Sequence, residues 1–325
     1  MAINTTLSTA STTYLNKTYY DRNLLENAKT KLVHAQYGQK RNIPKNGGKT
    51  VEFRKWVPLV ANTEENASGS NPTGLKLVEG VTPVSQSLSQ THVEATVAQY
   101  GAYYEVSDLL GMTSFDDVAE GATDLLGEAL GTAIDWVTRD AMSLTTTRQY
   151  ANGKTARSGI AAADKLTTTE IRKAVRTLKK AKARPFTRQG GKPHFIAIVS
   201  PDSVFDLQSD PMWQDVSKYS NAEQVYSGEI GRIFGVAFIE STEAKVYEKA
   251  GSSSADVHCT MVFGQDAYGV IDIEGSGNVQ TIIKTDGGTS DPLNQKKTIG
   301  GKVAAYTCVV LCPEHIIAIE HGVSA

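Results

Sequence analysis

The sequence predicts an α+β fold that carries one long hairpin arm. Two strand-patterned runs, 49–58 and 91–106, flank about thirty polar, turn-rich residues. A helix of roughly thirty residues is expected from near Ser114, and the later helices and strands show no regular βα alternation. Loops longer than about 12–15 residues are uncommon in compact domains, and an isolated two-stranded hairpin is marginally stable in water. The hairpin therefore indicates that its strands pack against a surface of another molecule. This favours a role in assembly over a role in catalysis.

The two strands of the hairpin are predicted by alternation. Val51 and Phe53 alternate with polar residues in the first run, and Val93 and Ala95 do so in the second. Gly101 interrupts the second run, which indicates a bulge. Each strand is therefore expected to have one apolar face.

The long helix has a start signal and one apolar stripe. Ser114 can cap its first turn, and Asp117 three residues later resembles a capping box. The stripe recurs at spacings of three and four and consists of Leu126, Leu130, Ile134, Val137, Ala141 and Leu144. Each glycine inside a helix costs up to about 1 kcal/mol relative to Ala. Gly121, Gly127 and Gly131 are therefore expected where another backbone approaches closely.

The remaining chain is predicted to mix helices and strands. A second helix is expected over about 168–183. The apolar run 194–199 is typical of a buried strand, and the Ser200-Pro201 pair after it favours a helix start. Further strands are expected at 233–240, 257–263, 269–273, 279–284 and 302–319.

Composition excludes several classes of protein. Of 325 residues, 40% are hydrophobic and 21% charged, so the chain can bury a core. A formal net charge of −2 argues against a dedicated nucleic-acid-binding protein. No run of about 18 apolar residues predicts a membrane span, and residues 1–18 are expected to form an extended arm rather than a secretion signal. Three cysteines do not make a disulfide framework, which favours a reducing, intracellular site of synthesis.

No motif indicates a catalytic, cofactor or metal site. Gly-Lys-Thr occurs at 48–50 and 153–155, but a phosphate-binding loop needs another glycine five residues before the first residue of this triplet. The residues found there are Ile43 and Arg148. Cys308 and Cys312 would lie about 13 Å apart along a strand, too far to share one zinc ion. We therefore expect no catalytic residues, no cofactor and no bound metal.

One cluster of charge stands above the background. Nine basic residues lie between 172 and 192, and no acidic residue follows Glu170 in this stretch. The stretch is either a solvated helix face or a surface for a phosphate backbone or an acidic neighbour. The candidate contacts are Arg172, Lys173, Arg176, Lys179, Lys180 and Lys182.

The hairpin carries the candidate residues for a subunit interface. Large aromatic side chains such as Trp56 serve either as core or as interface anchors. The candidates, which include apolar residues of the polar connecting segment, are Trp56, Val57, Leu59, Leu75, Leu77, Val81 and Leu88.

Several segments together resemble the major capsid proteins of tailed bacteriophages. The resemblance covers residues of about 25–285 and rests on the order and spacing of the segments. The segments are LVHAQYGQKRNIPKNGGKTVEFRK at 32–55, EGVTP at 79–83, VAQYGAYYEVSDLL at 97–110, IAIVSPDSVFDLQSD at 196–210 and GEIGRIFGVAFIESTEA at 228–244.

This resemblance implies the Johnson fold shared by tailed-phage and herpesvirus capsids. That fold has an N-terminal arm, an extended β-hairpin called the E-loop, a long spine helix, and peripheral and axial domains. The division it implies is 1–47 for the arm, 48–107 for the E-loop, 108–165 for the spine helix and peripheral domain, 166–280 for the axial domain, and 281–325 for C-terminal strands that return to the peripheral domain.

The resemblance also implies a structural protein of the virion rather than an enzyme. Such proteins self-assemble into hexamers and pentamers that close into an icosahedral shell around double-stranded DNA. The implied partners are other copies of the chain, a separate scaffolding protein, a portal, decoration proteins and packaged DNA held by weak non-specific contacts. Assembly is expected in the host bacterial cytoplasm. Some members of the family crosslink neighbouring subunits through Lys and Asn, but no motif here maps those residues, so the resemblance does not extend to crosslinking.

Two other functions stay open at the level of sequence. One is an enzyme with no recognisable motif. The other is a DNA-binding structural protein that uses the basic stretch 172–192, whose affinity for DNA would fall steeply with salt.

Overall fold

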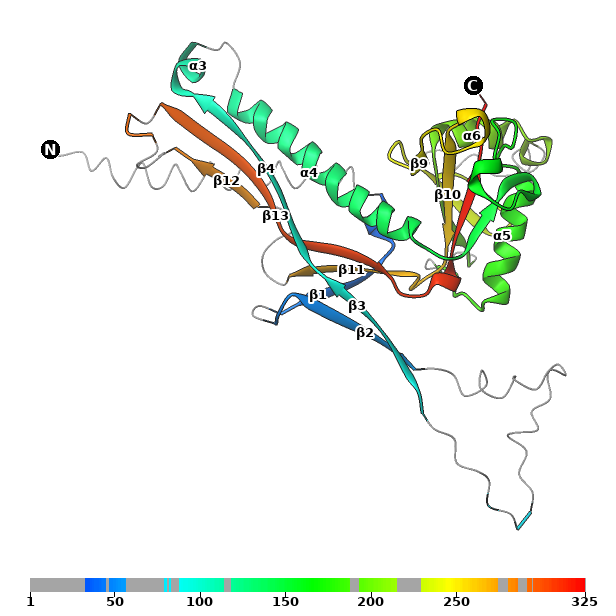
Figure 1. The fold of residues 1–325 in the computed structure, drawn as a ribbon. Coiled ribbons are helices and arrows are strands. Elements are labelled where there is room, and N and C mark those ends of the chain that lie inside the picture. The colour runs from blue at the N-terminus through cyan, green and yellow to red at the C-terminus, as the bar shows by residue number, and fades with distance from the viewer. Residues whose placement is uncertain are drawn as a thin grey trace. The chain divides into compact units, whose positions relative to one another are not determined.

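The computed structural model describes residues 33–44, 47–56, 79–80, 82, 88–113, 118–187, 193–214, 229–273, 280–285, 291–293 and 295–324. They fall into two compact units (Figure 1). The smaller unit spans Lys49–Thr96, and the larger contains the rest of the described chain. The larger unit is built on two β-sheets, each with its own helices.

A five-stranded sheet lies beside the longest helix. Its strands are β1 (Gln39–Ile43), β4 (Ala98–Ser107), β11 (Tyr268–Ile273), β12 (Gln280–Lys284) and β13 (Lys296–Val310). The long strand β13 pairs antiparallel with β4, β11 and β12, and β1 pairs parallel with β11. Strand β13 is therefore the centre of this sheet.

A seven-stranded sheet forms the second core. Its strands are β5 (Arg148–Tyr150), β6 (Phe195–Val199), β7 (Glu229–Ile233), β8 (Val236–Glu240), β9 (Val246–Tyr247), β10 (Val257–Phe263) and β14 (Ile316–His321). Every residue of β6, β10 and β14 is buried, as is typical of strands covered on both faces. The apolar run predicted as a buried strand is confirmed as β6.

Two helices cover one face of this sheet. They are α5 (Thr168–Lys180) and α6 (Pro201–Gln208). Neighbouring residues of β6 belong to different clusters of buried side chains. Ala197 belongs to the cluster that contains residues of α5 and α6, and Ile198 to the cluster that contains residues of the longest helix. The predicted helix start is confirmed, since Pro201 is the first residue of α6 and Ser200 caps it.

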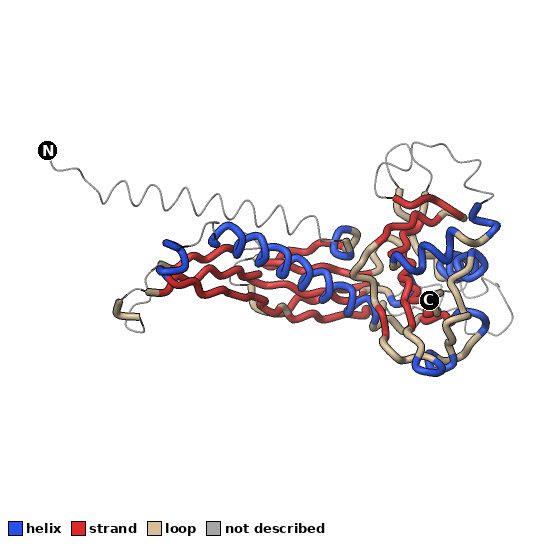
Figure 2. The backbone as a smooth tube through the Cα atoms, turned by 90° about the horizontal axis from the view of Figure 1, so that it is seen from above, coloured by secondary structure: helices blue, strands red, loops and turns tan. Residues whose placement is uncertain are grey.

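The long helix is α4 (Val118–Ser143), which runs along the five-stranded sheet (Figure 2). It has 26 residues, and the predicted cap at Ser114 and Asp117 lies outside the described residues. A separate short helix, α3 (Asp108–Thr113), precedes it. Most of the predicted stripe is confirmed, with Leu126, Leu130 and Ile134 buried and Val137 and Ala141 partly buried. Leu144 is exposed, because the helix ends one residue before it.

One of the three glycines predicted to permit close packing faces open space in the described chain. A side chain at Gly121 would meet open space, so that prediction is wrong, whereas Gly127 and Gly131 are buried. A close approach to α4 that was not predicted is made by Gly301 of β13, where an added Cβ would lie 2.6 Å from Leu130 Cδ1. Gly101 is paired in register rather than bulged, and the irregularity of that ladder lies near Val303.

The smaller unit is a two-stranded hairpin. It consists of β2 (Thr50–Trp56) and β3 (Gln90–Thr96), antiparallel from Thr50 opposite Thr96 to Trp56 opposite Gln90. The predicted second run, 91–106, is in fact two strands, because β4 leaves the hairpin after Val97 and pairs with β13. The expected hairpin 48–107 is therefore too long, and the unit ends at Thr96.

Four other expected boundaries also need correction. The predicted strand 302–319 is broken between β13 and β14, since Pro313 begins a short 3-10 helix there (Pro313–His315). As a result, β14 joins the seven-stranded sheet, so 281–325 does not return as one block to the five-stranded sheet. Likewise β1 is part of a sheet rather than of a free arm, and β11 belongs to the five-stranded sheet although it lies within 166–280.

Candidate assembly surfaces

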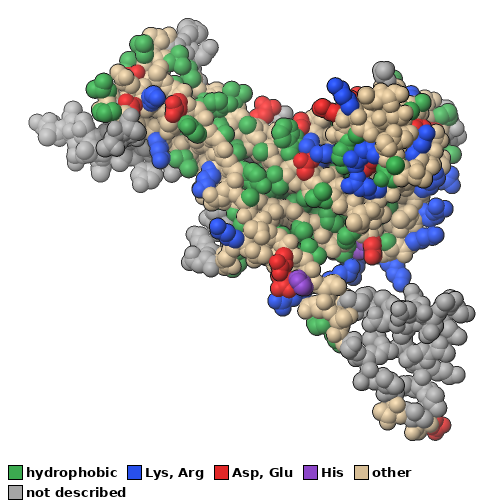
Figure 3. All heavy atoms as spheres, in the orientation of Figure 1, with side chains coloured by type: hydrophobic (Ala, Val, Ile, Leu, Met, Phe, Trp, Pro, Cys, Tyr) green, Lys and Arg blue, Asp and Glu red, His purple; other side chains and the backbone are tan. Residues whose placement is uncertain are grey.

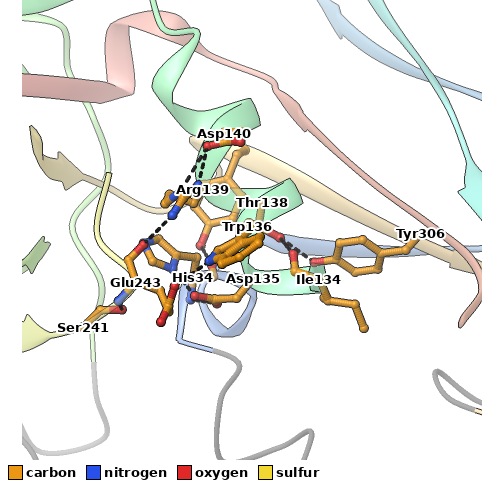
Figure 4. Close-up of polar contacts among 11 residues, drawn as sticks. His34, Ile134, Asp135, Trp136, Thr138, Arg139, Asp140, Ser241, Glu243 and Tyr306 are labelled. Atoms are coloured by element: carbon orange, nitrogen blue, oxygen red, sulfur yellow. Dashed lines mark hydrogen bonds and ion pairs between the residues drawn. The ribbon is translucent and has the colours of Figure 1, made fainter. Parts of the chain in front are cut away.

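The C-terminal half of α4 binds the segment that precedes β1. The backbone N–H of His34 donates to Asp135 Oδ1 (2.8 Å), and His34 Nδ1 lies 2.6 Å from Asp135 Oδ2 (Figure 4). Both side chains are buried, and the Tyr268 hydroxyl donates to the His34 carbonyl. This network holds the start of the described chain against the helix.

The same half of α4 also binds the loop between β8 and β9. Trp136 Nε1 donates to Glu243 Oε2 (2.5 Å), and Arg139 donates to the Glu243 carbonyl (3.0 Å). Lys245 Nζ donates to Asp140 (2.8 Å). Burial alone raises the pKa of Asp140, but hydrogen bonds from Lys245 and Arg139 outweigh it and lower that pKa. The hydroxyl oxygens of Thr138 and Tyr306 of β13 lie 2.6 Å apart, so the helix is bonded both to its own sheet and to a loop of the seven-stranded sheet (Figure 4).

A buried carboxylate joins a distant loop to the last strand. Glu320 of β14 is 0% exposed, and Arg157 binds it with two hydrogen bonds of 2.7 Å. Arg148 adds a third at 2.7 Å, and the guanidinium of Arg157 lies 3.4 Å from the centre of the Tyr247 ring. Hydrogen bonding to Glu320 raises the pKa of Arg157. Sequence reasoning missed this cluster, because its members lie 163 and 172 residues apart.

The hairpin unit exposes two of the predicted interface residues. Trp56 is 60% exposed and Leu88 is 76% exposed. The other five candidates, Val57, Leu59, Leu75, Leu77 and Val81, lie outside the described residues. In this chain alone Trp56 is therefore not core, and its exposure is consistent with an interface.

A second apolar surface was not predicted. We call it the α3 surface, and it consists of Leu109, Leu110 and Met112. Helix α3 buries none of its residues, and Leu109 and Met112 are 67% and 78% exposed. Figure 3 shows hydrophobic side chains gathered around this helix. The apolar residues at 109, 110 and 112 were the available signal, but sequence analysis assigned them no element of their own.

The basic residues of 172–182 lie on and just after α5. Arg172, Arg176, Lys179, Lys180 and Lys182 are exposed, as seen where blue side chains line that side of the molecule (Figure 3). Lys173 is different, because it is partly buried and pairs with Glu170 at 2.7 Å. The structure thus brings together most of the predicted basic contacts on one face.

One group of side chains resembles a nucleophile with its base. Ser200 Oγ lies 2.9 Å from His258 Nδ1, and Asp202 lies 4.0 Å from His258 Nε2. Ser200 is only 5% exposed, however, and its oxygen caps α6 by accepting from the backbone N–H of Ser203. The contacts therefore describe a helix cap and a buried hydrogen-bond network rather than an accessible nucleophile.

That network predicts a loss of stability in acid. His321 is fully buried near Thr260, Ser203 and His258, and burial lowers its pKa to about 4. Because the folded pKa lies below the unfolded value of about 6.5, the unfolded chain binds the proton first. Stability is complete above about pH 6.5 and is lost as pH falls toward 4, by about 3 kcal/mol for this one group.

Urea unfolding at pH 7 and pH 4.5 measures this loss. The His321→Gln variant is expected to lose less stability than the wild type between these values, whereas His92→Gln, on the exposed hairpin, should behave as the wild type. Burial also lowers the pKa of His258, with Asp202, Asp206 and Asp256 opposing it. An identical pH dependence for all three proteins would show that His321 does not contribute.

No described helix has the length and hydropathy needed to cross a membrane. No described group of three or more His, Cys, Asp or Glu side chains is placed to hold a metal ion. Cys259 and Cys308 are buried free thiols, and burial raises the pKa of each to about 12.

Comparison with known proteins identifies this architecture. The model of a family described as phage capsid protein matches residues 136–279. This match covers less than half of the chain, so it shows similarity to that family over these residues. No curated protein sequence matches the chain. The resemblance predicted from the sequence and the expected α+β capsid fold are confirmed.

Solved phage capsids have the same fold at low sequence identity. The capsid of Ralstonia phage GP4 is 14% identical, with 90% of this chain and 89% of that chain covered and a TM-score of 0.68. The capsid of cyanophage Pam1 is 15% identical, with 89% of each chain covered and a TM-score of 0.69. The head structure of Helicobacter pylori bacteriophage KHP40 is 12% identical, with 90% of this chain and 88% of that chain covered and a TM-score of 0.60. The chain thus matches these folds over nearly its whole length.

Proposed function

We propose that this capsid protein is the major subunit of an icosahedral head and self-assembles into hexamers and pentamers around double-stranded DNA. The observation that carries the proposal is the hairpin unit Lys49–Thr96, a two-stranded unit with an exposed Trp56. A hairpin of this kind is marginally stable alone. A neighbouring subunit supplies the surface that the monomer lacks.

The parts of the capsid fold have assigned roles in this proposal. The hairpin unit is the E-loop, α4 is the spine helix, and the segment before β1 is the N-terminal arm. The five-stranded sheet with α4 is the peripheral domain, and the seven-stranded sheet with α5 and α6 is the axial domain. The α3 surface is a second contact between subunits, because exposed apolar patches mark interaction sites.

The mechanism is geometric rather than enzymatic. The hydrogen bonds of Trp136, Arg139 and Asp140 hold α4 against the loop of the seven-stranded sheet, so the helix transmits the placement of one sheet to the other. Partners of this chain are other copies of itself, with a scaffolding protein, a portal, decoration proteins and packaged DNA held weakly. Assembly takes place in the host cytoplasm, before the shell becomes part of the virion.

Replacing Trp56 with Ala tests the assembly role of the hairpin. Trp56 is exposed in the single chain, so we expect no change in the urea midpoint of the unassembled protein. An interface anchor contributes about 2 kcal/mol or more, which raises the concentration needed for shells at least about tenfold. Light scattering during assembly measures that concentration.

The matched control is Thr91→Ala, a polar residue on the partner strand of the same hairpin. It should assemble as the wild type does. Equal losses of stability and assembly in Trp56→Ala would make Trp56 a core residue and would contradict its assignment to the interface.

A further inference from the structure

A hollow on the outer face of α5 is separate from the surfaces assigned to assembly. It is a shallow depression of about 500 Å³, largely open to solvent, beside the turn between β7 and β8. The residues that line it are Arg172, Val175, Arg176, Lys179, Lys180 and Phe234. The hollow thus combines four cationic side chains with an apolar wall.

The positive charge in this hollow is not neutralised within the described chain. Arg172, Arg176, Lys179 and Lys180 form no ion pair with a described carboxylate, whereas Lys173 on the same helix pairs with Glu170. Four like charges within about three turns of helix repel one another, which costs stability. An anionic partner would relieve that repulsion.

The backbone of Phe234 adopts a left-handed conformation that is unfavourable for Phe. Phe234 and Gly235 form the two-residue turn between β7 and β8, with φ of 52° and 79°. Turns of this type favour Asn-Gly, and a residue with a Cβ costs about 1–2 kcal/mol in the left-handed region. The ring is 39% exposed, so burial in the core does not explain it. Strained residues of this kind often mark functional sites.

Arg172 is positioned by the same ring. Its guanidinium lies 5.3 Å from the centre of the Phe234 ring, a cation–π contact. The stack orients the planar guanidinium while its N–H groups stay available for a carboxylate, which they bind with two parallel hydrogen bonds. The hollow is therefore organised for an anionic group next to an apolar one.

We propose that this hollow binds an acidic peptide segment of a separate protein, with one large apolar side chain against Phe234 and Val175. The carboxylates of the segment pair with Arg172, Arg176 and Lys179. Duplex DNA fits less well, because its phosphates line a convex surface and its bases are stacked inside, away from an aromatic wall. This binding does not require shell formation, so it can be tested on the unassembled chain.

Fluorescence anisotropy with three labelled probes tests the proposal. The first probe is a short peptide of glutamates around one Trp, the second replaces that Trp with Ser, and the third is a DNA duplex of about 20 base pairs. The wild-type protein is expected to bind the first probe about tenfold more tightly than the second, because only the first reaches the apolar wall. Duplex DNA should not displace the first probe at physiological salt.

Two variants and one control locate the binding site. Phe234→Asn should weaken binding of the first probe about tenfold. It should also raise the melting temperature, because Asn is favoured in this turn. Arg172→Gln should weaken the binding of both peptides. Phe205→Asn, an exposed Phe on α6, is the control and should change neither affinity. Unchanged peptide affinity in Phe234→Asn, or duplex DNA that binds more tightly than the peptide and displaces it, would overturn the proposal.

Discussion

Removing residues 57–89 and joining Trp56 to Gln90 through an Asn-Gly turn is expected to give a folded monomer that forms no shells. Trp56 and Gln90 are the last paired residues of the hairpin, so a two-residue turn closes it without a change of register. The larger unit has its own clusters of buried residues and should keep its fold. What is lost is the segment that carries most of the predicted interface residues.

Two measurements separate folding from assembly in this variant. Thermal unfolding of the unassembled protein should match the wild type, because the larger unit is unaltered. Negative-stain electron microscopy should show no closed particles. Normal shells from the shortened chain would contradict the assignment of the hairpin as the E-loop.

Replacing Glu320 with Ala is expected to destabilise the protein by about 3 kcal/mol. Removing one partner of a buried ion pair leaves the other charges without compensation. Here the change takes the shared carboxylate from Arg148 and Arg157 and opens a cavity under β14. Both guanidinium groups retain some contact with water, which keeps the loss at the lower end of the usual range.

The shift of the urea midpoint measures this loss. The matched control is Glu314→Ala, an exposed carboxylate in the short helix just before β14. The control should unfold within about 0.5 kcal/mol of the wild type. If Glu320→Ala unfolds at the same urea concentration as the control, the buried cluster does not stabilise the fold.

The sequence predicted those elements whose apolar residues recur at a regular local spacing. The stripe of α4 from Leu126 to Ile134 and the helix α5 follow from the spacing of apolar residues. The β6–α6 unit follows from its apolar run and the Ser200-Pro201 helix start. They could be predicted because each buries one face against a core, and that face is visible in the sequence.

Strand partners were harder to predict, because pairing joins residues far apart in the chain. The run 91–106 reads as one strand, yet Thr96 pairs within the hairpin and Ala98 pairs with Tyr306 of β13. Nothing in the local alternation marks this change of partner. The break at Pro313 carried a local signal, but the dense apolar run around it concealed the break.

The candidate surfaces also divide into those that the local sequence predicts and those that depend on the fold. Trp56 and the basic residues of α5 were predicted because their chemistry is visible locally. The α3 surface was missed, because its exposure depends on how α3 follows β4. The strain at Phe234 was also invisible, since it depends on a backbone angle rather than on residue type alone.

Size-exclusion chromatography combined with negative-stain imaging of the expressed full chain tests the central claim most directly. The account predicts species far larger than the 34.9 kDa chain, with hexameric or pentameric rings or closed shells in the images. A protein that elutes only as a monomer at every concentration, with no rings or shells in the images, would contradict it.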